Sequence, residues 1–306
     1  MVFARQIWLP CSLLSPLGIG LLLATPGPAA AEYAPNRIRI EYVPPTNPAH
    51  QPLYEMVKEQ HALEKLQQVF APFKYPMDVT IRTIGCDGHV NAWYSEPVVT
   101  LCYEYLEEIR RDMPKETTPA GVTPLDAELG QFFFAAAHEM GHATFDQLGL
   151  PLLGRQEDDA DQFATYIMLQ FGKADARRLI AGAAHSYKKY LLHPEVTAPL
   201  KDFADAHGAP EQRYFNLLCL AYGADPVLFA DIVEKKYLPE HRAEGCRYEY
   251  GNVNWAFSQL IDPHLDQQLT AQFLDRTWLP PVRATRTTVP VPAAPPSGGT
   301  GSRALQ

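Results

Sequence analysis

Basic residues are scarce in this sequence, and their scarcity limits the partners that the protein can bind. Lysine and arginine together number 26, against 35 aspartates and glutamates, so the formal net charge is −9 at pH 7. Residues 32–279 carry −13, because residues 1–31 contribute one arginine, residues 280–306 contribute three, and neither segment contains an acid. A nucleic-acid partner requires a basic face, so we expect none.

Other signatures are missing as well. The sequence has no glycine-rich phosphate loop, no local Ser-His-Asp pattern and no internal repeat. Beyond residue 31 no apolar run reaches the roughly 20 residues that span a bilayer, so no stable membrane span is expected after signal cleavage. The composition is that of a soluble globular protein, with 46% hydrophobic and 20% charged residues among 306.

Residues 1–31 are predicted to be a cleaved export signal. Arg5 precedes an apolar stretch that ends in GIGLLLA, and the small residues after it fit cleavage after Ala31. A transmembrane anchor is the alternative, but three prolines interrupt the run and it is shorter than roughly 20 residues. Cys11 is a poor lipoprotein site, because bulky residues precede it. The protein is therefore expected to be periplasmic or secreted.

The other end of the chain is also expected to lie outside the folded domain. Residues 280–306 are rich in Pro, Gly, Ser and Thr and have no run that could build a core. Such a composition is typical of a disordered tail. Residues 32–279 are thus predicted to be the folded domain.

Four of the five cysteines remain after signal cleavage, since Cys11 lies within the signal. Four cysteines can pair in three ways. Sequence proximity favours Cys86–Cys102 and Cys219–Cys246, each closing a modest loop, and an exported protein meets oxidising conditions. Four free buried thiols are the alternative.

The first third of the domain mixes strands and helices. Residues 37–43 alternate as a strand does, and apolar residues follow at helical spacing from Leu53 to Phe70. Residues 77–85 alternate again. Residues 91–113 read as two strands joined by a turn, the second of which runs into a helix.

The remainder is predicted to be mainly helical. Thr123 is a capping residue, Pro124 follows it at the first helical position, and Gly149 ends the segment. Further helices are expected over 155–172, 173–190, 210–222, 225–236 and 252–261. Strands first and helices afterwards predict an α+β fold, with a small N-terminal sheet, rather than a doubly wound parallel sheet.

The sequence HEMGH, from His138 to His142, lies within the first long helix. Residues four apart are about 40° apart on one helix face, so both imidazoles can bind one ion. Glu139 can then reach a water on that ion, which is the chemistry of H-E-x-x-H. A chance match is the alternative, but histidines seldom lie in an apolar run such as FFFAAAHEMGHATF without a partner. Gly141 indicates close approach of either a substrate or another helix.

A catalytic zinc usually has three protein ligands, and helical phase selects the third. The apolar face of the next helix consists of Ala160, Phe163, Ala164, Ile167, Met168 and Phe171. At about 100° per residue, Glu157 falls roughly 50° from the centre of this face and is the best ligand. Asp161, one turn later, is placed to accept a proton from a ligand histidine. Asp158 and Asp159 point further away and are expected to form a solvated helix start.

These residues carry a resemblance to known proteins. H-E-M-G-H followed by E-D-D-A-D resembles the glutamate-zincin metallopeptidases, in which E-x-x-x-D follows H-E-x-x-H. More closely, the chain resembles an uncharacterised family of exported bacterial metallopeptidases, through residues 81–109, 134–172 and 212–226. The resemblance covers roughly residues 37–270. It implies a zincin-like domain over 32–279, a zinc ion and a peptide or protein substrate.

The motif and the helical phase give roles to particular residues. His138, His142 and Glu157 would hold Zn²⁺, and Glu139 would be the general base. The resemblance implies that residues 91–102 contain the edge strand that aligns the substrate backbone, although an ordinary core hairpin fits them equally. The short gap from His142 to Glu157 departs from the thermolysin-like pattern, so the substrate-binding residues of that group are not transferred.

The oxyanion that forms during cleavage needs a further donor. The candidates, all after the site helices, are His185, Tyr187, His207, Arg213 and Tyr214.

Two classes of function stay open. The first is an exported zinc metallopeptidase that cuts peptide bonds within or at the end of a chain. The second is a catalytically silent zinc-binding protein that acts in interaction or regulation. An intact Glu139 weighs against the second, because binding requires the histidines but not the base. A different zinc hydrolase is the remaining alternative.

Overall fold

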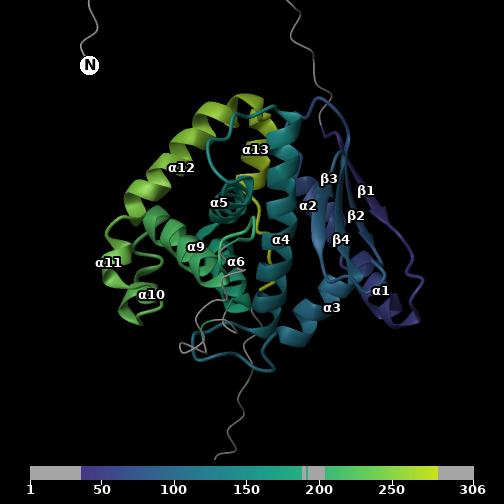
Figure 1. The fold of residues 1–306 in the computed structure, drawn as a ribbon, viewed down its shortest axis with the longest axis horizontal. Coiled ribbons are helices and arrows are strands. Elements are labelled where there is room, and N and C mark those ends of the chain that lie inside the picture. The colour runs from purple at the N-terminus through teal and green to yellow at the C-terminus, as the bar shows by residue number, and fades with distance from the viewer. Residues whose placement is uncertain (1–35, 188–190, 192–203, 282–306) are drawn as a thin grey trace, which may run out of the picture. The chain divides into compact units, whose positions relative to one another are not determined.

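The computed structural model describes residues 36–187, 191 and 204–281. The predicted export signal, and the predicted tail beyond residue 281, lie outside the described residues. The described part has the predicted α+β architecture, with one small sheet and a larger helical region (Figure 1).

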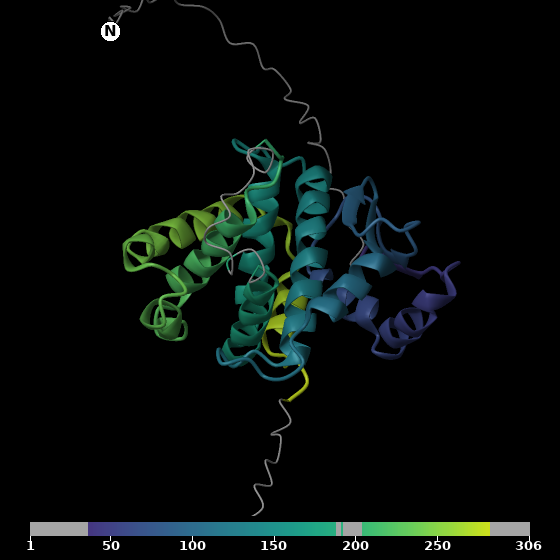
Figure 2. The same ribbon diagram turned by 60° about the horizontal axis from the view of Figure 1, so that its bottom comes forward.

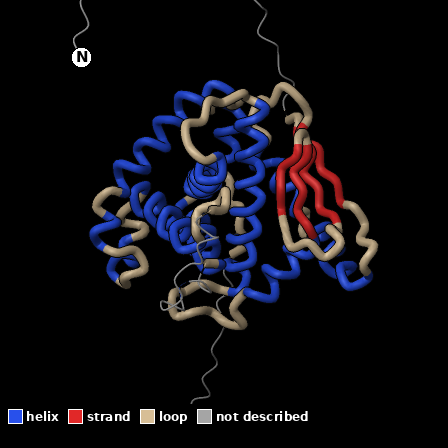
Figure 3. Tube along the Cα trace, viewed as in Figure 1, coloured by secondary structure: helices blue, strands red, loops and turns tan. Residues whose placement is uncertain are grey.

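The sheet has four strands in the order β1-β2-β4-β3 (Figure 3). The strands are β1 (Ile38–Tyr42), β2 (Val79–Ile84), β3 (Ala92–Ser95) and β4 (Val98–Cys102). β2 pairs in parallel with both β1 and β4, whereas β3 and β4 form an antiparallel hairpin. The predicted strands are confirmed, and β3 lies at an edge of the sheet.

A helical crossover connects the parallel strands β1 and β2, as such a connection requires. It consists of a short 3-10 helix (Pro48–His50), α1 (Gln51–Glu59) and α2 (Ala62–Phe70). The apolar spacing from Leu53 to Phe70 runs across two helices, because His61 adopts φ +52 between them. A left-handed residue cannot continue a right-handed helix.

The long central helix α4 (Pro124–Gln147) follows α3 (Tyr103–Asp112). Its start is as predicted. The Thr123 hydroxyl accepts the N–H of Asp126, and the Asp126 carboxylate accepts the N–H of Thr123. This reciprocal pairing satisfies two donors that a helix end leaves open. Gly149, with φ +58, follows the last turn.

The helical region is completed by α5 (Gln156–Leu169), α6 (Lys173–Ser186), α9 (Pro210–Ala224), α10 (Ala230–Glu234), α11 (Glu240–Ala243), α12 (Cys246–Leu260), a 3-10 helix (Asp262–His264) and α13 (Gln267–Leu274). The helix predicted over 225–236 is mostly wrong. The Asp225 carboxylate accepts the N–H groups of Val227 and Leu228, which forms a turn there instead. α12 begins six residues earlier than the predicted segment.

Helix α4 separates the sheet from the other long helices (Figure 1; Figure 2). α6 crosses it so closely that the two backbones touch. A Cβ added to Gly182 would lie 1.8 Å from the carbonyl oxygen of Asp126, and one added to Gly130 would lie 2.5 Å from the amide nitrogen of Ala183. Only glycine fits at these two positions, so the backbones of α4 and α6 are in direct contact there.

Both predicted disulfides are present. Cys86–Cys102 joins the loop after β2 to the end of β4, and Cys219–Cys246 joins α9 to α12. Disulfides are typical of proteins that mature in an oxidising, exported compartment. None of the described helices is long and apolar enough to cross a membrane.

The contact at Gly182 predicts a large effect of one methyl group. Gly182→Ala should lower the free energy of unfolding by about 1–3 kcal/mol, because the helices must separate to admit the side chain. Gly251→Ala is the matched control, since a Cβ there meets no atom within 4 Å. It should raise stability by about 0.5–1 kcal/mol, the usual gain within a helix. Urea denaturation measures both, and a Gly182→Ala protein as stable as the wild type would contradict the contact.

Candidate metal centre

Helices α4 and α5 bring three ligand atoms together. The Nε2 atoms of His138 and His142 lie 3.2 Å apart, and the Glu157 Oε2 atom lies 3.0 Å from the first and 3.2 Å from the second. Both histidines project from one face of α4, four residues apart, and Glu157 lies in the first turn of α5. The three side chains form a group that could hold a metal ion.

The separations suit a small metal ion. Four ligands arranged tetrahedrally at about 2.0–2.2 Å from a zinc ion lie roughly 3.3–3.6 Å from one another. The distances between the three atoms are a few tenths of an ångström shorter, so a slight outward movement of these side chains would admit the ion.

The chemistry of the donors also fits a cation. The Nδ1 atom of His138 lies 2.8 Å from Asp161 Oδ1 and donates its proton to that carboxylate. Nε2 then carries a lone pair, and it faces the Glu157 carboxylate, which is also an acceptor. Two acceptors at this distance require a proton or a metal ion between them.

The pKa values of His138 and Glu157 also show that this group of side chains stabilises a positive charge. Burial alone would lower the pKa of His138, but its hydrogen bonds with Asp161 and Glu157 raise it to about 9. The hydrogen bond with His138 lowers the pKa of Glu157 to about 2, against the effect of burial. A metal ion can take the place of that shared proton.

Arg213 holds Asp161 in position. Its Nε and Nη2 atoms each lie 2.7 Å from one oxygen of the carboxylate, in a bidentate pair. Burial would raise the pKa of Asp161, but the hydrogen bonds with His138 and Arg213 lower it to about 2. An ionised Asp161 therefore fixes the tautomer and orientation of the His138 ring.

Gly141 serves the packing of α5 against α4. A Cβ at this position would lie 3.2 Å from Phe163 Cδ1 and 3.3 Å from Ala160 Cα. Of the two explanations left open by the sequence, close helix packing is the one that the structure shows. The absence of a side chain at Gly141 brings the acidic start of α5 within reach of the histidines.

Glu139 lies beside this group and is 8% exposed. Burial raises the pKa of its carboxyl group to about 7, and the charge of Glu157 acts in the same direction. The charge of His138 and a hydrogen bond from the backbone N–H of Tyr94, on β3, act against the shift. A carboxyl group with a pKa near neutrality is suited to accept and return a proton.

A cleft with an empty volume of about 1700 Å³, including its open mouth, exposes these groups. One wall is the edge strand β3, where Ala92, Trp93, Tyr94 and Ser95 line the cleft. The N–H of Cys102 donates a hydrogen bond to the carbonyl of Asn91. Every second residue of an antiparallel strand bonds to its partner strand, so the N–H and C=O groups of Trp93 also face β4. The backbone groups of Ala92 and Tyr94 consequently point away from β4.

The five sequence candidates for the oxyanion donor are distributed unevenly. Tyr187, His207 and Arg213 line the cleft, whereas His185 and Tyr214 are not among the residues that line it. The His207 Nε2 atom lies 2.8 Å from Glu157 Oε2, and its ring stacks against that of His138 at 5.7 Å. Arg213 is already paired with Asp161, and its guanidinium lies 5.8 Å from the Tyr187 ring.

The other two acids of the cluster take no part in this group. Asp158 pairs with Arg155 at 2.7 Å. Asp159 is half-buried, and both burial and the neighbouring Asp158 charge raise its pKa.

A second group of potential ligands is explained by other bonds. Cys86, Cys102 and Glu104 lie close together. The two sulfurs form a disulfide and so supply no thiolate, and the Glu104 carboxylate accepts the N–H groups of Cys86 and Gly88. These bonds account for all three side chains without a metal.

Some residues of the cleft had no signal in the sequence. Tyr105 and Glu108 reach it from α3, and the Tyr94 hydroxyl donates to Asp146 at 2.7 Å. No local motif marks these side chains, since only the packing of α3 and β3 beside α4 brings them to the site.

Comparison with known families agrees with this geometry. The model of a family described as "Putative metallopeptidase" matches residues 42–261, and the chain belongs to this family. Searches of curated proteins and of solved structures find no match. The membership supports a metal-dependent peptidase with a peptide or protein substrate.

The ligand assignment predicts different outcomes for neighbouring acids. Glu157→Ala should abolish stoichiometric Zn²⁺ binding at pH 7, because it removes the carboxylate oxygen that lies 3.0 Å from His138 Nε2 and 3.2 Å from His142 Nε2. Asp158→Ala should bind Zn²⁺ as the wild type does. Metal content after dialysis, measured by atomic emission, distinguishes the two. Zinc retained by Glu157→Ala would refute the assignment.

Replacing Asp161 is predicted to weaken zinc binding less than replacing Glu157, because Asp161 orients a histidine and does not itself face the metal position. Asp161→Asn should reduce the affinity for Zn²⁺ by about 10–100-fold, since the histidine loses the carboxylate that orients it. Asp159→Asn, two residues earlier on α5, is the control and should leave the affinity unchanged. Competition with a chromogenic chelator gives the dissociation constants, and equal values for the two variants would exclude the supporting role.

Proposed function

We propose that this protein is an exported, zinc-dependent metallopeptidase that hydrolyses peptide bonds with Glu139 as general base. The observation that carries the proposal is the convergence of His138, His142 and Glu157 beside a buried Glu139, in a cleft bordered by an edge strand. Membership of the metallopeptidase family supports the same reaction.

Zinc is the metal that the donor set favours. Two imidazoles and one carboxylate are a common set of catalytic zinc ligands, with a fourth position left for water. When bound, Zn²⁺ supplies a Lewis acid that polarises the peptide carbonyl and lowers the pKa of water toward 7.

Glu139 has the position and the pKa for proton transfer. Its carboxylate accepts a proton from the attacking water and then delivers it to the nitrogen of the leaving amine. Glu139 lines the cleft but is only 8% exposed, and the Tyr94 N–H orients its carboxyl group. Asp161 and Arg213 keep His138 directed at the metal position throughout.

The edge strand is suited to align the substrate. An extended peptide can add to β3 through the outward-facing carbonyls of Ala92 and Tyr94, as peptides add to free sheet edges. The scissile bond would then lie over Glu139, whose carboxylate already contacts this strand.

His207 is the best of the candidate oxyanion donors. It lines the cleft on the side of Glu157 and lies against the His138 ring, so its Nε2 atom is close to where the oxyanion would form. Tyr187 is the second choice. Arg213 is better assigned to holding Asp161, and His185 and Tyr214 lie away from the cleft lining.

The alternative of a silent zinc-binding protein is less well supported. Binding alone does not need a buried carboxyl group with a raised pKa next to the ligands, yet Glu139 is such a group. Export is proposed from the predicted signal and is consistent with the two disulfides.

Replacement of the base separates catalysis from binding. Glu139→Gln should bind zinc normally but lose peptide hydrolysis by about 10²–10⁴-fold, because the amide cannot take the proton. Glu128→Gln, on the same helix but outside the cleft lining, should retain both. Zinc content and turnover of casein or a quenched-fluorescence peptide library test the proposal. Equal turnover by Glu139→Gln and wild type would overturn the mechanism, and no turnover by the zinc-loaded wild type would favour the silent alternative.

A further inference from the structure

A second pocket lies on another face of α4. It has an empty volume of about 850 Å³, which includes open solvent at its mouth. It is lined by residues of α1, α2, α3, α4 and α6, by Phe171 after α5 and by the segment that follows α13. Among the residues that the structure describes, none lines both this pocket and the metal cleft.

The two sites use different faces of one helix. Leu129, Phe132 and Phe133 line the second pocket, whereas Phe134, His138 and Glu139 line the cleft. The second pocket is therefore not an extension of the peptidase site, and its occupant need not be the substrate.

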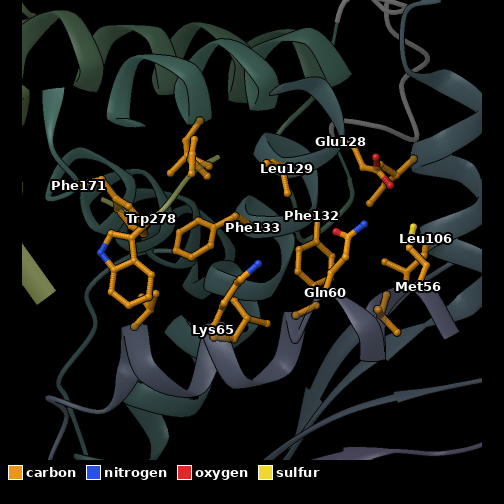
Figure 4. A pocket seen from close by; sticks show the side chains of 17 residues that line it. Met56, Gln60, Lys65, Leu106, Glu128, Leu129, Phe132, Phe133, Phe171 and Trp278 are labelled. Carbon is orange, nitrogen blue, oxygen red and sulfur yellow. The ribbon is translucent and has the colours of Figure 1, made fainter. Parts of the chain in front are cut away.

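The lining of the second pocket is almost entirely apolar and is elongated. Figure 4 shows its side chains in a row, from Phe171 and Trp278 at one end to Leu106 and Met56 at the other. The row follows α2 on one side and α4 on the other. A row of apolar side chains suits a linear hydrocarbon chain better than a compact ring system, because every methylene can contact the protein.

One cation lines this apolar pocket. Lys65 projects from α2 toward Phe132 and Phe133 (Figure 4). Lys65 and Gln60 are both exposed, so they lie where the pocket opens to solvent, and within the described ranges the Lys65 ammonium group has no ion pair or hydrogen bond. Glu128, the acid in the lining, faces Arg110 at 3.5 Å instead. A cation without a partner beside an apolar wall is suited to an anionic head group.

We propose that this pocket binds a single-chain amphiphile with a carboxylate head, its hydrocarbon chain lying along Phe132, Phe133 and Trp278 and its carboxylate on Lys65. Few polar groups at one point of an apolar pocket are the usual arrangement for fixing such a ligand. The site is independent of the metal centre, so its test does not depend on peptidase activity.

The binding is measured by calorimetry on the full mature chain, with sodium decanoate, sodium hexanoate and 1-decanol as probes below their aggregation concentrations. Decanoate should bind saturably with one molecule per chain and quench the fluorescence of Trp278, which lines the pocket. Hexanoate should bind at least about 10-fold more weakly, because four methylenes are lost. 1-Decanol should also bind at least about 10-fold more weakly, because it has no charge for Lys65.

Lys65→Gln tests the head-group contact. It should weaken decanoate binding by about 10–100-fold and leave 1-decanol binding unchanged. Lys74→Gln is the matched control, since Lys74 carries the same charge but does not line the pocket, and it should bind both probes as the wild type does. Circular dichroism verifies that both variants are folded.

Three results would overturn the proposal. Absence of saturable decanoate binding would exclude the site. Equal weakening by Lys65→Gln and Lys74→Gln would show a general charge effect rather than a head-group contact. Decanoate binding that appears only after removal of residues 282–306 would assign the pocket to the chain's own C-terminal segment.

Discussion

The close packing of α5 against α4 is the constraint on which the candidate site depends. The two histidines come from α4, whereas Glu157 and Asp161 come from α5, so the group exists only while these helices stay in contact. Gly141 permits that contact, because any side chain there would press against Ala160 and Phe163. Gly141, within the HEMGH motif, thus allows Glu157 to come within reach of the two histidines.

Helix α9 also supports the candidate site, through an ion pair with α5. Arg213, on α9, pairs with Asp161 on α5, which in turn bonds to His138 on α4. These side chains are partly buried. Removing one of them would therefore leave a buried charge on its neighbour without an opposite charge. α6, locked to α4 at Gly130 and Gly182, gives the same helix a rigid support on another side.

Much of this arrangement could be predicted from local sequence rules. Thr123 and Gly149 mark the ends of α4, and helical phase alone separated Glu157 from Asp158, because a helix fixes the direction of each side chain. The positions that could not be predicted depend on contacts between distant segments. The break at His61, the hydrogen bond from the Tyr94 N–H to Glu139 and the position of His207 beside Glu157 all depend on tertiary packing, which local sequence patterns do not predict.

The hydrogen bond between the Tyr94 N–H and Glu139 has a consequence for the hairpin of β3 and β4. In an antiparallel pair, successive backbone groups face alternately toward and away from the partner strand. Inserting one residue into the turn at Glu96 would shift the register by one and direct this N–H to β4. Glu139 would then lose its backbone donor, although no residue of the metal centre had changed. The length of this surface turn therefore determines whether Glu139 has a backbone donor.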